Sequence, residues 1–213
     1  MMAKHEPRGR PSHRGMAVLV YGAMTLCAVV IAWARGVSLI RGPANLPELG
    51  SPLASLALGA ALAMLTIAAT RRIVLRTRWG KTLREDFRAL LADATPSDAV
   101  WLALLSGVGE ELLFRGALLP WWGLAGSSLA FGVLHVGPAR RFLGWTLWAS
   151  VLGALLGEIC QITGRIEGAI LAHVLINAVN LRFVLAFDGR LDTARRDPAE
   201  QALVARPRRR ETR

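Results

Sequence analysis

Three ionisable residues lie inside a stretch that is otherwise apolar, and this feature constrains the fold more than any other. The stretch runs from about residue 99 to residue 122, and the charges are Glu110, Glu111 and Arg115. On membrane-insertion scales a central Asp, Lys or Arg costs about 2.5–3.5 kcal/mol, whereas each Leu returns only about 0.3–0.6 kcal/mol. If Glu behaves like Asp, the neighbouring leucines cannot offset this cost. The charges therefore need partners, a wet cavity or a function.

The rest of the composition is typical of an integral membrane protein. The 213-residue chain is 53% hydrophobic with a mean hydropathy of +0.39, and its apolar residues form blocks instead of alternating as in strands. The net charge of +11 lies between and beyond these blocks, without interleaved aromatic residues, so it indicates membrane topology and not nucleic-acid binding. We predict an all-α integral membrane protein, a bundle of about six transmembrane helices with a polar intramembrane cavity.

The apolar blocks divide the chain into four parts. Residues 1–15 form a basic tail, and residues 16–96 hold two spans and a basic amphipathic segment. Residues 97–187 form the helical core with the candidate site, and residues 188–213 form a second basic tail. The six expected spans cover, in order, about residues 16–34, 49–70, 99–122, 123–137, 142–162 and 167–187.

The segment between the second and third spans mixes basic and apolar residues, which predicts an amphipathic helix on the inner membrane surface, interrupted near Gly80. A solvated linker helix is the alternative. Ser97 or Asp98 is expected to cap the third span. Six crossings place both tails, this segment and the turn at Arg140 on the cytoplasmic side, in agreement with the positive-inside rule. We therefore expect a multi-pass protein of the inner (cytoplasmic) membrane with both termini in the cytoplasm.

Helix geometry separates the roles of the three charges. At about 100° per residue, Arg115 lies one turn after Glu111 on nearly the same face, but roughly 140° around the helix from Glu110. Glu111 and Arg115 can therefore satisfy one another, and a buried ion pair that only locks helix packing explains them best. Glu110 is left free to face a cavity, where a carboxyl group can serve as general base or acid.

Two further polar pairs occur in later spans. Phe131 and His135 lie four residues apart near the inner end of the fourth span, and His173 and Asn177 share one face of the sixth. Each polar side chain needs hydrogen-bonding partners in lipid, so we expect these groups to lie close to Glu110 in the folded bundle. A glutamate base with histidine and asparagine donors suits addition of water to a peptide carbonyl. Glu110, His135 and His173 would alternatively form a two-His-one-carboxylate metal site, and spacing does not choose between the two.

The ordered set of motifs EExxxR (Glu110, Glu111, Arg115), FxxxH (Phe131, His135) and HxxxN (His173, Asn177) resembles that of a known family. This is the CAAX protease and bacteriocin-processing (CPBP, or Abi) family of intramembrane proteases, which includes the Rce1-type prenyl-protein endopeptidases. The resemblance covers about residues 98–182. It implies that Glu110 activates water, that His135 assists and that His173 with Asn177 forms the oxyanion site. Glu111, Arg115 and Phe131 would be supporting residues.

The function implied is that of a glutamic-type intramembrane endopeptidase. It would hydrolyse a peptide bond of a membrane-embedded or lipid-anchored protein or peptide, with the lipid bilayer as its other partner and no nucleic acid. No cofactor is expected, and zinc on Glu110, His135 and His173 is the alternative. The competing hypothesis is a non-proteolytic membrane scaffold or bacteriocin-immunity protein that uses the same polar core for packing or for binding a partner.

Overall fold

The computed structural model describes residues 13–186, so the predicted tails lie outside the described residues except for residues 13–15. Within the described part the chain is helical and has no strand. The α-helices are α1 (His13–Arg35), α2 (Pro52–Arg76), α3 (Arg78–Leu90), α4 (Pro96–Glu111), α5 (Leu119–Val133), α6 (Leu143–Thr163) and α7 (Glu167–Leu185). A π-helix, η2 (Leu112–Leu118), joins α4 to α5, and two short 3₁₀ turns are η1 (Pro47–Leu49) and η3 (Arg140–Phe142).

The predicted fold class, an all-α membrane protein, is confirmed. Within residues 13–186, four segments are long and apolar enough to cross a membrane: α1, α2, α6 together with η3, and α7. Many large apolar side chains on these helices are exposed, as expected for surfaces that face lipid. The two other expected spans correspond to α4 with η2 and to α5. The first of these is continuous to Trp122, because the first residue with non-helical dihedrals is Gly123 at φ +68°.

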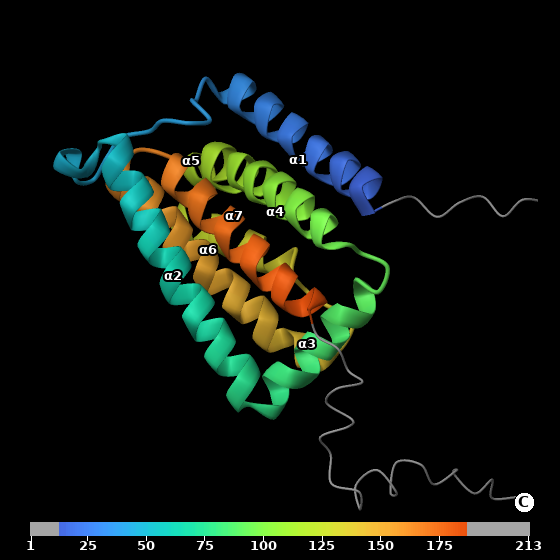
Figure 1. The fold of residues 1–213 in the computed structure, drawn as a ribbon. Helices are drawn as coiled ribbons and strands as arrows, with labels where there is room; N and C mark the ends of the chain where they lie inside the picture. Colours follow the sequence, from blue (N-terminus) through green and yellow to red (C-terminus); the bar gives the residue numbers. More distant parts are fainter. Residues whose placement is uncertain (1–12, 187–213) are drawn as a thin grey trace, which may run out of the picture.

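Helix α7 lies in the middle of the bundle (Figure 1). It packs against α2 on one side and α4 on the other, while α1 covers α4 and α6 packs against α5. The contact between α2 and α7 depends on small residues. A Cβ atom at Gly59 would lie 2.1 Å from the carbonyl oxygen of Gly168, and the Ser55 hydroxyl accepts a hydrogen bond from the Gly168 N–H at 3.1 Å. This is the close backbone approach that small residues permit between membrane helices.

The basic segment differs from the prediction in where its helix breaks. Helix α2 continues to Arg76, and α3 passes through Gly80 without interruption. The break is at Thr77, whose side chain caps α3 by accepting a hydrogen bond from the Gly80 N–H at 2.9 Å. Gly80 instead allows α3 to fold back on α2, because a Cβ atom there would lie 2.7 Å from the Ile73 carbonyl oxygen.

The cap of α4 also differs from the prediction. The N-cap is Thr95, whose hydroxyl accepts a hydrogen bond from the Asp98 N–H, while Asp98 accepts one from the Thr95 N–H at 2.8 Å. This reciprocal arrangement is a capping box, so Asp98 contributes at the third helical position and Ser97 is not the cap. Asp98 also binds Arg14 at 2.6 Å, which fixes the start of α1 against α4.

Candidate active site

The charged residues of the third span lie where the α-helix changes to a π-helix. Glu110 and Glu111 end α4, and Arg115 lies in the π-helix that follows. Here the N–H of Leu119 donates to the carbonyl oxygen of Phe114, five residues earlier. The Ser127 hydroxyl of α5 donates to the same oxygen at 2.7 Å. Such π-helical turns are frequent at functional sites, where they change the direction of side chains.

Glu111 is fully buried and is hydrogen-bonded to Arg115 and His173. Its Oε1 atom accepts hydrogen bonds from Arg115 Nη1 at 2.9 Å and from His173 Nδ1 at 2.7 Å. Arg115 also donates from Nη2 to the carbonyl oxygen of Gly153 at 2.9 Å. The predicted Glu111–Arg115 pair is therefore present, and it extends to α7 and α6. A buried charge is tolerated when it is paired and hydrogen-bonded in this way.

Glu110 belongs to a different group of atoms. Its Oε2 atom lies 3.8 Å from Nε2 of His135, too far for a direct hydrogen bond, and this buried oxygen has no hydrogen-bond partner among the described residues. Buried polar atoms are nearly always satisfied, so an unpaired carboxyl oxygen beside a histidine is a place where water or a substrate group is needed.

The two histidines have defined orientations. His135 Nδ1 lies 2.7 Å from the carbonyl oxygen of Phe131. A carbonyl oxygen only accepts, so Nδ1 carries the hydrogen and Nε2 faces Glu110. His173 Nδ1 likewise donates to the Glu111 carboxylate, which leaves its Nε2 for the cavity. Because Nδ1 donates its hydrogen to Glu111, a second donor at Nε2 of His173 would require the imidazolium form.

Phe131 lies at the centre of these groups. Its ring centroid is 4.5 Å from that of His135, 5.8 Å from that of His173 and 4.4 Å from the Arg115 guanidinium carbon. The ring thus packs against His135 on one hand and against Arg115 and His173 on the other. The supporting role of Phe131 stays a prediction.

Asn177, the last of the predicted site residues, is hydrogen-bonded to Ser106, a residue that the sequence analysis did not identify. Its Nδ2 donates to the Ser106 hydroxyl oxygen at 2.9 Å, which ties α7 to α4. The second unidentified residue is Tyr21 of α1, whose hydroxyl interacts with the side chains of Glu110 and Ser106. The chain has a single tyrosine, and its position inside an apolar span was the signal that could have indicated a role.

These groups line one cavity of about 390 Å³. Its polar lining includes Glu110, His135, His173, Asn177, Ser106 and Tyr21. The remaining walls are apolar and aromatic, and residues of α3, among them Leu83 and Phe87, close the end of the cavity at the amphipathic segment. A largely apolar cavity with a few convergent polar groups is the usual form of a small-molecule or substrate site.

The alternative metal site would need Glu110, His135 and His173 as its ligands. Within residues 13–186, no group of three or more His, Cys, Asp and Glu side chains is arranged to hold a metal ion. The absence of a cofactor stays a prediction, as does the alternative of zinc.

Fold and site together define the class: an all-α membrane protein with a polar site enclosed in its helical bundle. Residues 93–179, which include every candidate residue of the three motifs, match the family described as type II CAAX prenyl endopeptidase Rce1-like. This segment of the chain is therefore Rce1-like, and the resemblance predicted from the motifs is confirmed over it.

One curated relative adds to this match. The chain is 34% identical over 109 residues to the uncharacterized protein YpbD of Bacillus subtilis (strain 168), which corresponds to 50% of this chain and 53% of the relative. The chain thus spans about half the length of the curated relative that it matches. No solved structure matches the chain.

Proposed function

We propose that the protein is an intramembrane endopeptidase of the glutamic type. The observation that carries this proposal is the Oε2 atom of Glu110, which is buried without a partner, lines the cavity and lies 3.8 Å from Nε2 of His135. A water molecule between these two atoms would be held by an acceptor that can remove its proton. The match of residues 93–179 to the family described as type II CAAX prenyl endopeptidase Rce1-like supports this proposal.

In the proposed reaction, Glu110 takes a proton from water as the water oxygen attacks the carbonyl carbon of the scissile peptide bond. The carbonyl oxygen becomes an oxyanion, and the Nε2–H of His173 and the amide of Asn177 stabilise it. The carbon–nitrogen bond then breaks, and the proton held by Glu110, passed directly or through His135, moves to the leaving amine. The products are a carboxylic acid and an amine, and the glutamate returns to its ionised form.

The Glu111–Arg115–His173 network has a positioning role in this proposal. Glu111 accepts from Nδ1 of His173, so it fixes the orientation of the ring whose Nε2 would face the oxyanion. Arg115 compensates the charge of Glu111 and anchors it to α6 through the Gly153 carbonyl. Glu111 therefore supports catalysis by orienting another residue.

We further propose that the reaction needs no metal. Analysis of the metal content of the purified protein, together with activity after incubation with a strong zinc chelator, tests this directly. Full activity in metal-free protein is the expected result. Loss of activity on chelation and its recovery with zinc would contradict the proposal.

We propose a membrane-embedded or lipid-anchored protein or peptide as substrate, and the inner membrane as the location with both termini in the cytoplasm. The support is the basic character of α3, which ends the cavity and belongs on the cytoplasmic side by the positive-inside rule. Labelling of single cysteines introduced beside α3 and in the 36–46 loop, from each side of the membrane, would test the orientation.

The decisive experiment measures cleavage of a membrane-tethered reporter by the wild type, by Glu110→Gln and by Glu158→Gln. Glu158 is an exposed glutamate on α6 outside the cavity, so it is the matched control. Glu110→Gln should reduce cleavage by at least about 10³-fold, as expected for loss of the group that activates water, while Glu158→Gln should cleave like the wild type. Equal cleavage by wild type and Glu110→Gln would refute the proposed function.

A second candidate is a non-proteolytic scaffold or immunity protein. It is favoured by the Glu111–Arg115–His173 network, which links α4, η2 and α7 and would lock helix packing without any chemistry. Under this function Glu110→Gln retains the cellular phenotype, whereas variants of Glu111 or Arg115 lose it by unfolding.

A further inference from the structure

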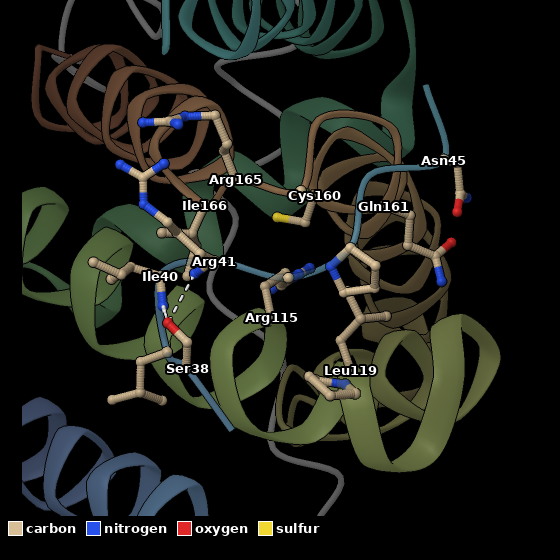
Figure 2. A pocket seen from close by; sticks show the side chains of 15 residues that line it. Ser38, Ile40, Arg41, Asn45, Arg115, Leu119, Cys160, Gln161, Arg165 and Ile166 are labelled. Atoms are coloured by element: carbon tan, nitrogen blue, oxygen red, sulfur yellow. Dashed lines mark hydrogen bonds between the residues drawn. The ribbon is translucent and has the colours of Figure 1, made fainter. Parts of the chain in front are cut away.

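A second cavity, of about 260 Å³, lies at the end of the bundle opposite α3. The loop that follows α1 and the turn between α6 and α7 form its walls. Three arginines line it, Arg41, Arg115 and Arg165, and none of the described residues in its lining is Asp or Glu. Figure 2 shows Arg41 and Arg165 on one side of the cavity, Asn45 and Gln161 on the other, and Arg115 between them.

Two of these arginines have N–H donors without a hydrogen-bond partner among the described residues. Arg115 is 4% exposed and Arg165 is 7% exposed, and the Nε atom of each is buried without a hydrogen-bond partner among the described residues. Arg165 binds Glu167 at 2.7 Å and Arg115 binds Glu111, but Arg41 forms no ion pair within residues 13–186. The lining therefore has one uncompensated positive charge and two buried unpaired N–H groups, and buried unpaired donors indicate a missing acceptor.

The walls of this cavity are built and held by the backbone. Gly42 N–H donates to the Gly164 carbonyl at 3.0 Å, and Asn45 N–H donates to the Gln161 carbonyl at 2.8 Å. Gly164 has φ +64°, and a Cβ atom there would lie 2.5 Å from the Gly42 carbonyl oxygen, so the turn requires glycine. The Ser38 hydroxyl accepts from the Arg41 N–H at 3.1 Å and orders the segment that presents Arg41. The arginines thus project from fixed positions.

We infer that this cavity is a binding site for a phosphate-type oxyanion. Guanidinium groups present planar sets of donors that match phosphate oxygens, and an anion among three arginines would satisfy the unpaired Nε–H groups and offset the excess charge. The cavity lies at an end of the membrane-crossing bundle, where the headgroup of an anionic phospholipid and free phosphate both have access.

The site is connected to the candidate active site through Arg115. The same guanidinium donates to Glu111, which in turn holds His173, and it also lines the second cavity. A bound oxyanion would therefore hold the network from the side opposite to the 390 Å³ cavity. Binding should raise the stability of the whole protein, because a ligand that binds only the folded state stabilises it.

The test uses the full chain in a detergent that contains no phosphate. Binding of inorganic phosphate is measured by calorimetry, and the unfolding midpoint is measured in phosphate and in chloride at equal ionic strength. In a second arm the protein is placed in vesicles of phosphatidylcholine alone or with added phosphatidylglycerol. Protection by phosphate identifies free phosphate as a ligand, and protection by phosphatidylglycerol alone identifies the lipid headgroup.

Arg41→Gln and Arg35→Gln provide the matched variants. Arg41 is exposed, so its substitution should leave the unfolding midpoint in chloride unchanged and weaken oxyanion binding about tenfold or more, as for loss of one charge-assisted hydrogen bond. Arg35 carries the same charge near this end but stacks on Trp121 outside the cavity, and its variant should bind like the wild type. The inference is overturned if neither phosphate nor phosphatidylglycerol protects beyond its control, or if Arg41→Gln binds as tightly as Arg35→Gln.

Discussion

His173 donates its Nδ1–H to Oε1 of Glu111, with the two atoms 2.7 Å apart, so two glutamates adjacent in sequence belong to different groups. Glu111 is hydrogen-bonded to His173 and Arg115, whereas Oε2 of Glu110 is buried without a partner. Neighbouring residues on a helix point about 100° apart, which allows one carboxylate to be structural while the next faces the cavity. The division has consequences for stability that differ between the two positions.

Neutralising each glutamate should therefore affect the free energy of unfolding to very different extents. Glu111→Gln leaves Arg115 buried without a compensating charge, and we expect a loss of about 3–5 kcal/mol in the free energy of unfolding. Glu110→Gln removes a charge that has no hydrogen-bonding partner at Oε2, and should change stability by less than about 1 kcal/mol. Thermal unfolding of both purified variants beside the wild type measures the difference. Similar losses at both positions would contradict the separation.

The contact of α2 with α7 gives a prediction about the fold. Gly59→Ala places a Cβ atom where the Gly168 carbonyl oxygen lies 2.1 Å away, and because the obstacle is backbone, the two helices must move apart. We expect a loss of about 1–3 kcal/mol, as for other overpacked contacts. Gly22→Ala in α1 is the control, because a Cβ atom there meets nothing within 4 Å. It should be neutral or slightly stabilising, because Ala favours the helix more than Gly does. Equal loss of stability in both variants would show that the close approach at Gly59 does not cause the loss.

Much of the fold could be predicted from the hydrophobic blocks. A segment that crosses lipid must satisfy its backbone hydrogen bonds internally, and a helix does so within one segment. The boundaries were less accessible. Thr95 became the cap of α4 because its hydroxyl and the Asp98 carboxyl satisfy each other's N–H groups, and Thr77 separated α2 from α3 by the same kind of hydrogen bond. Several Ser, Thr and Asp side chains within three residues of one another can form such a hydrogen bond to the backbone. The sequence pattern alone does not show which of them caps the helix.

The candidate site shows the same limit at longer range. Motif spacing placed Glu111 with Arg115 and aligned His173 with Asn177, because both pairs lie one turn apart on a helix. It could not assign His173 to Glu111 or Asn177 to Ser106, since those contacts depend on how α7 packs against α4. Nor could it place Tyr21 near Glu110, which depends on the packing of α1.

The lowered pKa of Asp98, at the start of α4, predicts how the stability of the protein depends on pH. Hydrogen bonds from the Thr95 backbone and from Arg14 lower the pKa of Asp98 from 3.8 to about 2. A carboxyl group whose pKa is lowered on folding contributes stability above its unfolded pKa and loses it as pH falls towards the folded pKa. The stability difference between wild type and Asp98→Asn should thus be constant above about pH 5 and shrink between about pH 4 and pH 2. Unfolding midpoints measured across this range test it, and a difference that persists unchanged at pH 2 would contradict it.

The hydrogen bond between Asn177 and Ser106 allows two roles to be tested apart: Asn177 as the oxyanion donor and Ser106 as the residue that positions it. If the amide of Asn177 stabilises the oxyanion, Asn177→Ala should lower kcat by about 10²–10³-fold with little change in KM, because the interaction exists only in the transition state. Ser106→Ala keeps the amide and removes only the hydroxyl that accepts from Nδ2 at 2.9 Å, so the decrease in kcat should be about tenfold or less. Steady-state cleavage of the membrane-tethered reporter gives both constants. If Ser106→Ala lost as much activity as Asn177→Ala while remaining folded, the hydroxyl, and not the amide, would be the group that acts on the substrate.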